Sequence, residues 1–182
     1  MYGMVNDAVR GLVRSAFGEE AWKQIHTKAD APESFVAMQT YDDEVTYNLV
    51  GAAVEVLQLD AETVLQTFGK YWVSDVATEH YASLMSNTGI SFVDFVKNLD
   101  HMHQRIRTTF PDYQPPSFRV IDIGDDRIQV DYYSKREGLL PFVEGLFDGL
   151  ATHFNTVISI THQADDSHPL PCKRMIVQYK TK

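Results

Sequence analysis

His103 lies in an apolar stretch of sequence, where a buried imidazole can bind a metal or a cofactor. Apolar residues precede and follow it in steps of three and four, which places them with His103 on one face of a helix: Phe92, Phe95, Val96, Leu99, Met102 and Ile106. His101 is rotated about 200° from His103 on the same helix and is expected to face solvent. A histidine in such a stripe is more often a core residue than a ligand, and the helix alone does not distinguish the two.

A second group of polar side chains ends a run with two-residue periodicity. Tyr132, Ser134 and Arg136 continue the face that carries Ile128 and Val130. A guanidinium on a buried face needs an anion, because its desolvation is costly, and no carboxylate precedes it on that face. Arg136 could grip a ligand carboxylate while the two hydroxyls donate to the same or a second group. An ion pair with a distant Asp or Glu would serve equally, and both explanations stay open.

The elements that must position these residues change character once along the chain. Residues 1–110 show helical periodicity, and residues 111–182 show strand alternation interrupted by one helix, which predicts an α+β fold. The expected helices cover 2–17, 19–28, 44–58, 61–77, 91–109 and 139–154, with Asp43, Asp60 and Ser91 as N-caps. The expected strands of a four-stranded antiparallel sheet cover 117–123, 127–135, 156–162 and 173–180.

Length and charge exclude several classes of protein. The 182 residues fit one domain, 1–182, in which the proline-rich segment 110–116 ends a helix and joins an α-rich part, 1–110, to an α+β part, 111–182. The 16 basic and 25 acidic residues give a net charge of −9, which does not favour nucleic acid as a partner. The single cysteine, Cys172, fits a reducing compartment, and no apolar stretch is long enough to span a membrane, so we expect a cytoplasmic protein.

The sequence does not favour an enzyme. It contains no nucleophile elbow, phosphate-binding loop or metal-ligand spacing. The cluster His162, Asp165, Asp166 and His168 lies in a Pro- and Asp-rich segment, which is more typical of a solvated turn than of a metal site.

Several motifs together resemble one family. The run Tyr132-x-Ser134-x-Arg136 matches the propionate-binding signature of the haem nitric oxide/oxygen binding (H-NOX) family. The opening Met1-Tyr2-Gly3-Met4-Val5-Asn6 and three further runs look like the sensor domain of soluble guanylate cyclase: Phe68-Gly69-Lys70, Asn98-Leu99-Asp100-His101-Met102-His103 and Pro116-Ser117-Phe118-Arg119. The resemblance covers the whole chain, as in a bacterial stand-alone member of the family.

The resemblance implies a cofactor and the residues that hold it. A haem b (iron protoporphyrin IX) would lie between the two parts of the chain, and the second histidine of the Leu-Asp-x-x-His run, His103, would be the proximal iron ligand. Tyr132, Ser134 and Arg136 would bind the propionates, and Pro116 would pack on the porphyrin. Gly145 and Gly149, four residues apart, would permit close approach of a flat ring or of another helix.

The resemblance also implies which gas binds. The distal pocket would be lined by Val5, Trp72, Phe142 and Leu146. Oxygen-binding members carry a tyrosine where alignment on Gly145 places Phe142, and phenylalanine cannot donate a hydrogen bond to bound oxygen. We therefore expect a nitric oxide sensor that also binds carbon monoxide. Trp72 stands where other members have Phe or Asn, and its indole N–H keeps an oxygen sensor as the alternative.

The family mechanism implies that nitric oxide weakens the bond between His103 and the iron until the imidazole leaves. The α-rich part would then rotate against the other part, and a separate protein would read the change of shape. We expect a monomer whose partner is a histidine kinase or a cyclic-di-GMP enzyme.

Overall fold

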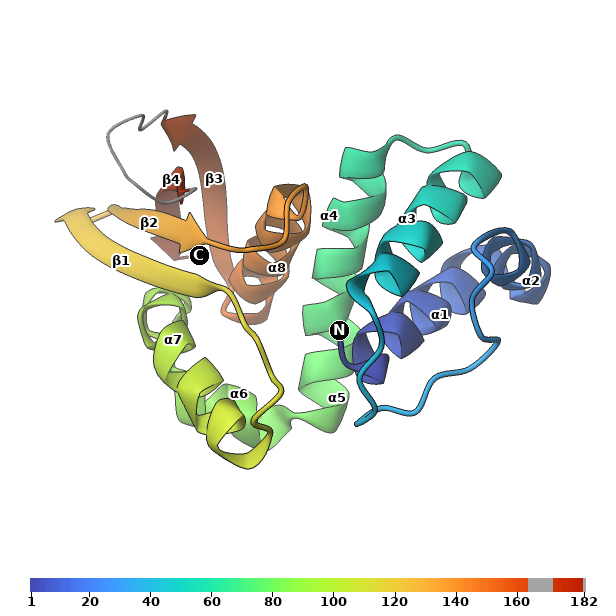
Figure 1. Cartoon of the computed structure of the whole chain (residues 1–182). Helices are drawn as coiled ribbons and strands as arrows, with labels where there is room; N and C mark the ends of the chain where they lie inside the picture. Colours follow the sequence, from blue (N-terminus) through green and yellow to red (C-terminus); the bar gives the residue numbers. More distant parts are fainter. Residues whose placement is uncertain (164–171, 182) are drawn as a thin grey trace.

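The chain folds into a helical part and a sheet-containing part that lie side by side (Figure 1). The computed structural model describes residues 1–163 and 172–181. The helices are α1 (Gly3–Phe17), α2 (Glu19–Lys28), α3 (Asp43–Leu57), α4 (Ala61–Tyr71), the π-helix η1 (Trp72–Ala77), α5 (Thr78–His80), α6 (Ala82–Thr88), α7 (Phe92–Thr109) and α8 (Leu140–His153).

The strands form one antiparallel sheet in the order β1-β2-β4-β3. They are β1 (Ser117–Gly124), β2 (Arg127–Tyr133), β3 (Thr156–Gln163) and β4 (Cys172–Thr181). Residues from α7 and α8 share a hydrophobic cluster with the inward-facing residues of β2 and β4. The α+β fold with a four-stranded antiparallel sheet is therefore confirmed.

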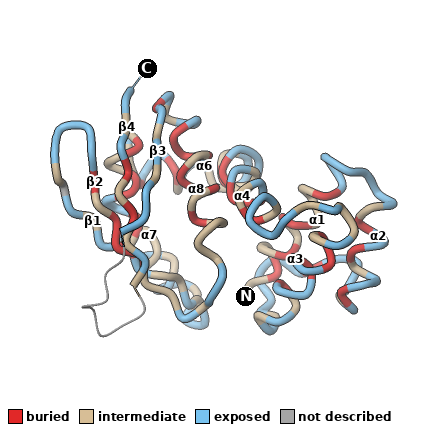
Figure 2. Tube along the Cα trace, turned by 90° about the horizontal axis from the view of Figure 1, so that it is seen from above, coloured by how far each residue is buried: buried red, intermediate tan, exposed pale blue. Residues whose placement is uncertain are grey.

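Two hydrophobic clusters make up the core and meet at Trp72. One lies among α1 to α4, and the other joins α7, α8 and the sheet, so that buried residues follow both parts of the chain (Figure 2). The stripe expected on α7 is buried at Phe92, Phe95, Val96 and Leu99. Because this stripe packs toward the sheet, α7 belongs to the same hydrophobic cluster as the sheet. The boundary between the two clusters therefore lies near residue 72, whereas the change from helical to strand periodicity in the sequence lies at residue 110.

The ends of some helices and strands differ from those expected from the sequence. Asp60 and Ser91 cap α4 and α7 as expected, by accepting hydrogen bonds from the backbone N–H of Thr63 and Asp94. Asp43 is not an N-cap, because α3 begins at Asp43 itself and Asp42 precedes it without a side-chain cap. Strand β2 ends at Tyr133, two residues before the expected end. The short helices α5 and α6 had no counterpart in the sequence pattern.

Helices α4 and α8 pack backbone against backbone and join the two parts of the molecule. A Cβ atom on Gly69 would lie 2.3 Å from the carbonyl oxygen of Phe142, and one on Gly145 would lie 2.1 Å from that of Gln66. A Cβ atom on Gly149 would lie 2.8 Å from the Cβ of Val73 in η1 and 3.2 Å from the carbonyl oxygen of Lys70 in α4. Of the two uses expected for the pair Gly145 and Gly149, the structure shows the approach of another helix.

Replacing Gly145 with alanine is expected to destabilise the protein by about 3 kcal/mol, since the added methyl group meets backbone that can move only with the whole helix. The midpoint of urea unfolding measures the effect. Gly51→Ala, in α3, is the matched control: a Cβ there meets nothing within 4 Å, and alanine favours a helix interior by about 0.5 to 1 kcal/mol. Equal midpoints for the two variants would contradict the tight packing of α4 on α8.

A buried carboxylate lies on the sheet face opposite α7 and α8. Asp131 is 2% exposed, and its two oxygens accept hydrogen bonds from Arg174 at 2.7 and 2.9 Å across the β2–β4 pairing. Gln129 donates to the same carboxylate at 3.0 Å. The hydrogen bonds and charge of Arg174 hold the pKa of Asp131 below its usual range, although burial raises it.

The variant Asp131→Asn is expected to lose about 2 kcal/mol of stability at pH 7, because Arg174 then faces a neutral amide. A depressed folded-state pKa contributes stability above the unfolded value, near pH 3.9, and this contribution is lost as the pH falls through the lower folded value. The gap between variant and wild type should therefore close in urea unfolding below about pH 3.9. The exposed pair of Lys70 and Asp148 supplies the control, since Asp148→Asn should cost less than about 1 kcal/mol.

Two expected absences concern membranes and metals. Among residues 1–163 and 172–181, no helix combines the length and apolar character of a membrane span. In the same residues, no group of three or more His, Cys, Asp or Glu side chains could hold a metal ion. His162 pairs with Glu144 at 2.6 Å, and Asp165, Asp166 and His168 lie outside the described residues.

Candidate functional site

The imidazole of His103 lies among aromatic rings where α7 faces the segment before β1. Its ring centroid is 5.9 Å from that of Tyr113 and 6.1 Å from that of Phe118. The Nδ1 atom is buried and makes no full hydrogen bond within the described part of the chain, although the backbone of Pro116 interacts with the imidazole. His101 is exposed, as its place on the helix predicted. A buried ring nitrogen without a full hydrogen bond requires an explanation, since an unmet hydrogen bond costs stability.

The surroundings keep His103 neutral. Burial has the largest influence and lowers the pKa of the imidazole, while the charge of Asp100 and the backbone of Pro116 raise it by less. Burial also raises the pKa of Tyr113 to about 12. Both side chains nevertheless keep some accessible surface. A neutral imidazole has a free lone pair on one ring nitrogen and can bind a metal.

Asp100 fixes the position of the His103 helix relative to the sheet. One carboxylate oxygen accepts from the backbone N–H of Phe118 and the other from the Ser117 hydroxyl, both at 2.7 Å. These bonds fasten α7, one turn before His103, to the first residues of β1. They also hold the end of the segment that contains Pro116 close to the imidazole.

The three donors expected at the end of β2 do lie together, although only Tyr132 belongs to the strand. Tyr132 is buried, and burial raises its pKa, while the hydroxyl of Ser134 and the charge of Arg136 lower it by less. The Ser134 hydroxyl accepts from the backbone N–H of Arg136 at 3.0 Å and so folds the loop back on itself. The charge of Arg136 also acts on Tyr113, whose ring neighbours that of His103.

Arg136 has the distant carboxylate partner that the sequence left open. Its Nε–H donates to Asp43 at 2.7 Å, and Nη2–H donates to the other oxygen of the same carboxylate at 3.2 Å. Nη1–H donates to the carbonyl oxygen of Gln114 at 2.8 Å. Asp43 is 93 residues away in sequence, so an inspection of residues near Arg136 could not find it.

Of the four residues expected in the distal pocket, three lie around Phe68. The Phe142 ring is 4.8 Å from the Phe68 ring, and the Trp72 ring is 6.4 Å from it. Val5 packs against the same cluster, and Leu146 packs against the cluster that includes the sheet. The indole N–H of Trp72 has no hydrogen bond to any described residue. Trp72 also begins the π-helix η1, a distortion that is frequent at functional sites.

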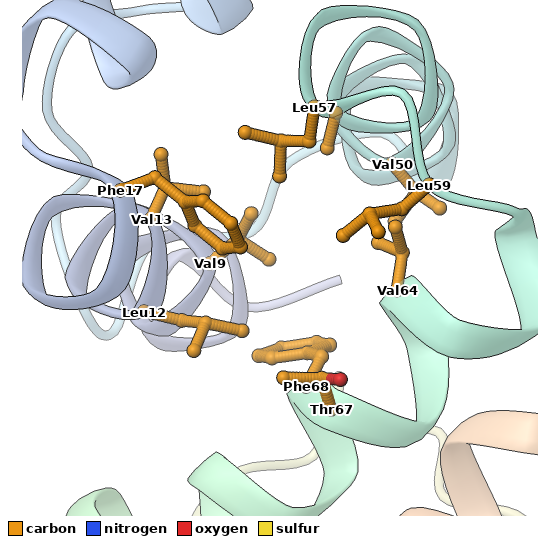
Figure 3. A pocket seen from close by; sticks show the side chains of 11 residues that line it. Val9, Leu12, Val13, Phe17, Val50, Leu57, Leu59, Val64, Thr67 and Phe68 are labelled. Carbon is orange, nitrogen blue, oxygen red and sulfur yellow. The ribbon is translucent and has the colours of Figure 1, made fainter.

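An apolar cavity of about 30 Å³ lies behind Phe68, among α1, α3 and α4 (Figure 3). Its walls are aliphatic and aromatic apart from Thr67, with Val9, Val50 and Leu57 on the side away from Phe68. The cavity is far too small for a porphyrin, and none of its walls includes His103 or Arg136. It is therefore separate from the site described above.

Most of the chain matches a known family. A family model described as haem-NO-binding matches residues 2–162. The chain belongs to the H-NOX family.

Two residues of the site, Tyr113 and Asp43, were not predicted as site residues from the sequence. The only signal for Tyr113 was its place in the proline-rich segment, which indicated a helix stop.

Curated relatives and solved structures agree with this membership. Soluble guanylate cyclase 89Db of Drosophila melanogaster is 26% identical over 155 residues, which cover 85% of this chain and 23% of the relative. Soluble guanylate cyclase gcy-33 of Caenorhabditis elegans is 28% identical over 155 residues, which cover 85% of this chain and 16% of the relative. The chain thus spans less than a quarter of either cyclase.

Two H-NOX structures share the fold over the full length of this chain. The protein from S. oneidensis in the Fe(II)NO ligation state gives a TM-score of 0.86 at 21% identity and covers 100% of both chains. The unliganded Fe(II) protein from K. algicida gives a TM-score of 0.85 at 20% identity, covering 100% of this chain and 98% of that chain. H-NOX domains are haem-binding gas sensors.

The residues present fit a haem. A neutral imidazole whose Nδ1 makes no full hydrogen bond lies beside the ring of Tyr113. The charge of Arg136 acts on the same Tyr113, and Arg136 lies with Tyr132 and Ser134 in a group of donors that could bind carboxylates. This donor set is what an apolar macrocycle with carboxylate tails needs.

Proposed function

We propose that this chain senses nitric oxide at a ferrous haem b and signals to a separate protein through loss of the His103–iron bond and rotation of the two parts. The observation that carries the proposal is the enclosed, neutral imidazole of His103 beside the carboxylate-binding group formed by Tyr132, Ser134 and Arg136. In this proposal the domain acts as a sensor. When bound, the haem would supply a ferrous iron with an open position for a diatomic gas.

Each residue has one task in this proposal. His103 on α7 would hold the iron, and Pro116 would pack against the porphyrin. Tyr132 and Ser134 would donate hydrogen bonds to the propionates, and Arg136 would add charge-assisted hydrogen bonds.

The choice of gas follows from the distal side chains. Val5, Phe142 and Leu146 carry no donor, so oxygen, which gains negative charge on binding, would not be stabilised there. Nitric oxide and carbon monoxide need no such donor. We therefore propose that the protein binds nitric oxide in preference to oxygen.

The fold offers a route from the site to the surface. His103 lies on α7, and Asp100 ties that helix to β1 through Ser117 and Phe118. A movement of His103 would therefore move the edge of the sheet, while α4 and α8 hold the two parts together. A partner protein, such as a histidine kinase or a cyclic-di-GMP enzyme, would read the change. We place this sensor as a monomer in the bacterial cytoplasm.

A second candidate function is an oxygen sensor, because the indole N–H of Trp72 has no partner among the described residues and lies beside the Phe68–Phe142 pair. A stable oxygen complex that Trp72→Phe abolishes would favour this candidate.

Titration of the apoprotein with haem tests the proposal. Absorbance should saturate at an equimolar amount of haem, and the reduced protein should change its spectrum with nitric oxide but not with air. Failure to bind haem, or binding at many weak sites, would contradict it.

A further inference from the structure

Arg136 keeps two of its five N–H groups available. Three are used, two by the oxygens of Asp43 and one by the Gln114 carbonyl. Since Nε has one hydrogen and each terminal nitrogen has two, one N–H remains on Nη1 and one on Nη2. Two adjacent N–H groups of this kind can bind a carboxylate with paired hydrogen bonds. Asp43 therefore binds Arg136 and leaves hydrogen-bond donors of the guanidinium for a ligand.

Helix α3 holds the Arg136 loop at two points one turn apart. Asp43 binds the guanidinium, and the Tyr47 hydroxyl donates to the carbonyl oxygen of Glu137 at 3.1 Å. Residues four apart lie on the same face of a helix, so both contacts come from one side of α3. The loop that follows β2 is thereby fastened to the helical part of the molecule.

The charges around Arg136 still favour an anion. The N-terminal ammonium of Met1 donates to Asp43 Oδ1 at 2.8 Å, so two cations share one carboxylate. Burial raises the pKa of Asp43, but the hydrogen bonds and charges of Arg136 and of the ammonium outweigh it and hold the pKa below its usual range. Among Asp43, Arg136 and the Met1 ammonium there are two cations for one carboxylate, and an incoming carboxylate would balance the second cation.

We propose that Asp43 is a positioning residue that orients Arg136 toward a ligand carboxylate, with Tyr47 securing the same loop. The inference rests on the proposed function, because the ligand that carries the carboxylates is the haem. It adds a role for α3, an element that supplies none of the expected haem contacts. Without Asp43, the flexible Arg136 side chain would have to be ordered by the ligand, at a cost in binding.

Iron-free protoporphyrin IX isolates this contact, since it has the propionates and has no metal for His103 to bind. Its dissociation constant, measured by fluorescence, is expected to rise about tenfold in Asp43→Asn, as for loss of one charge-assisted interaction. Tyr47→Phe should raise it by a smaller factor. Asp42→Asn is the matched control, because it changes net charge equally at an exposed neighbour that caps nothing.

A double variant separates positioning from general stability. In an Arg136→Ala background, Asp43→Asn should change porphyrin affinity by less than about twofold, because Asp43 acts through Arg136. Equal effects in both backgrounds, or an Asp43→Asn protein that binds porphyrin as well as or better than Asp42→Asn, would overturn the inference. Wild-type protein that binds neither porphyrin nor haem would overturn the proposed function as well. If Asp43→Asn does not fold, Tyr47→Phe compared with Asp42→Asn decides the question.

Discussion

The variant His103→Gly is expected to lose the proposed protein ligand to the iron and to recover a wild-type-like spectrum when imidazole is added. The side chain is enclosed and neutral, so the space it leaves can accept a free imidazole molecule. Absorbance spectra of the ferrous variant, with and without millimolar imidazole, measure the effect.

His101→Ala is the control, since His101 is exposed two residues earlier on the same helix. Its ferrous spectrum should match that of the wild type. The reverse pattern, in which His101→Ala loses the ligand and His103→Gly keeps it, would contradict the assignment of His103 as the iron ligand.

The variant Phe142→Tyr is expected to bind oxygen in air, which the wild type should not do. The Phe142 ring lies 4.8 Å from that of Phe68 and is proposed to face the bound gas, so a hydroxyl at its end would add the hydrogen-bond donor that bound oxygen requires. One such donor contributes on the order of 100-fold or more to the stabilisation of a developing negative charge. The ferrous spectrum in air-saturated buffer measures oxygen binding directly.

Phe142→Leu serves as the control, because it changes the ring without adding a donor. If Phe142→Tyr binds no oxygen and Phe142→Leu behaves identically, Phe142 does not point at the bound gas. The distal pocket would then have to be built around other residues.

Local patterns predicted the elements well. The stripe on α7 came from apolar residues at helical spacing, and the structure buries Phe92, Phe95, Val96 and Leu99 as expected. The caps at Asp60 and Ser91 follow from side chains that accept a hydrogen bond from the backbone only three residues onward. Such features depend on neighbours in sequence, which is why a single sequence reveals them.

Long-range contacts of the site could not be found in this way. Arg136 meets Asp43 across 93 residues, and Tyr47 meets Glu137 across 90. No periodicity connects such positions, and Asp43 was instead interpreted as a helix cap. The burial of Asp131 was not predictable for the same reason. Its place on the outer face of the sheet suggests exposure, and only the pairing of β2 with β4 brings Arg174 over it.

The role of Trp72 also depends on the folded chain. In sequence it continues helix 61–77, whereas in the structure it ends regular α-helix and packs against both hydrophobic clusters. A side chain shared by two clusters is sensitive to their relative position. We expect the rotation proposed for signalling to change the packing of this residue.

The anaerobic absorbance spectrum of the purified ferrous protein, recorded before and after nitric oxide and in a second sample opened to air, tests the central claim most directly. The account predicts a spectrum of iron bound by one histidine, its conversion by nitric oxide to that of iron without the histidine, and no oxygen complex in air. A stable oxygen complex, or a nitric oxide spectrum in which the histidine stays bound, would contradict a nitric oxide sensor that signals through His103.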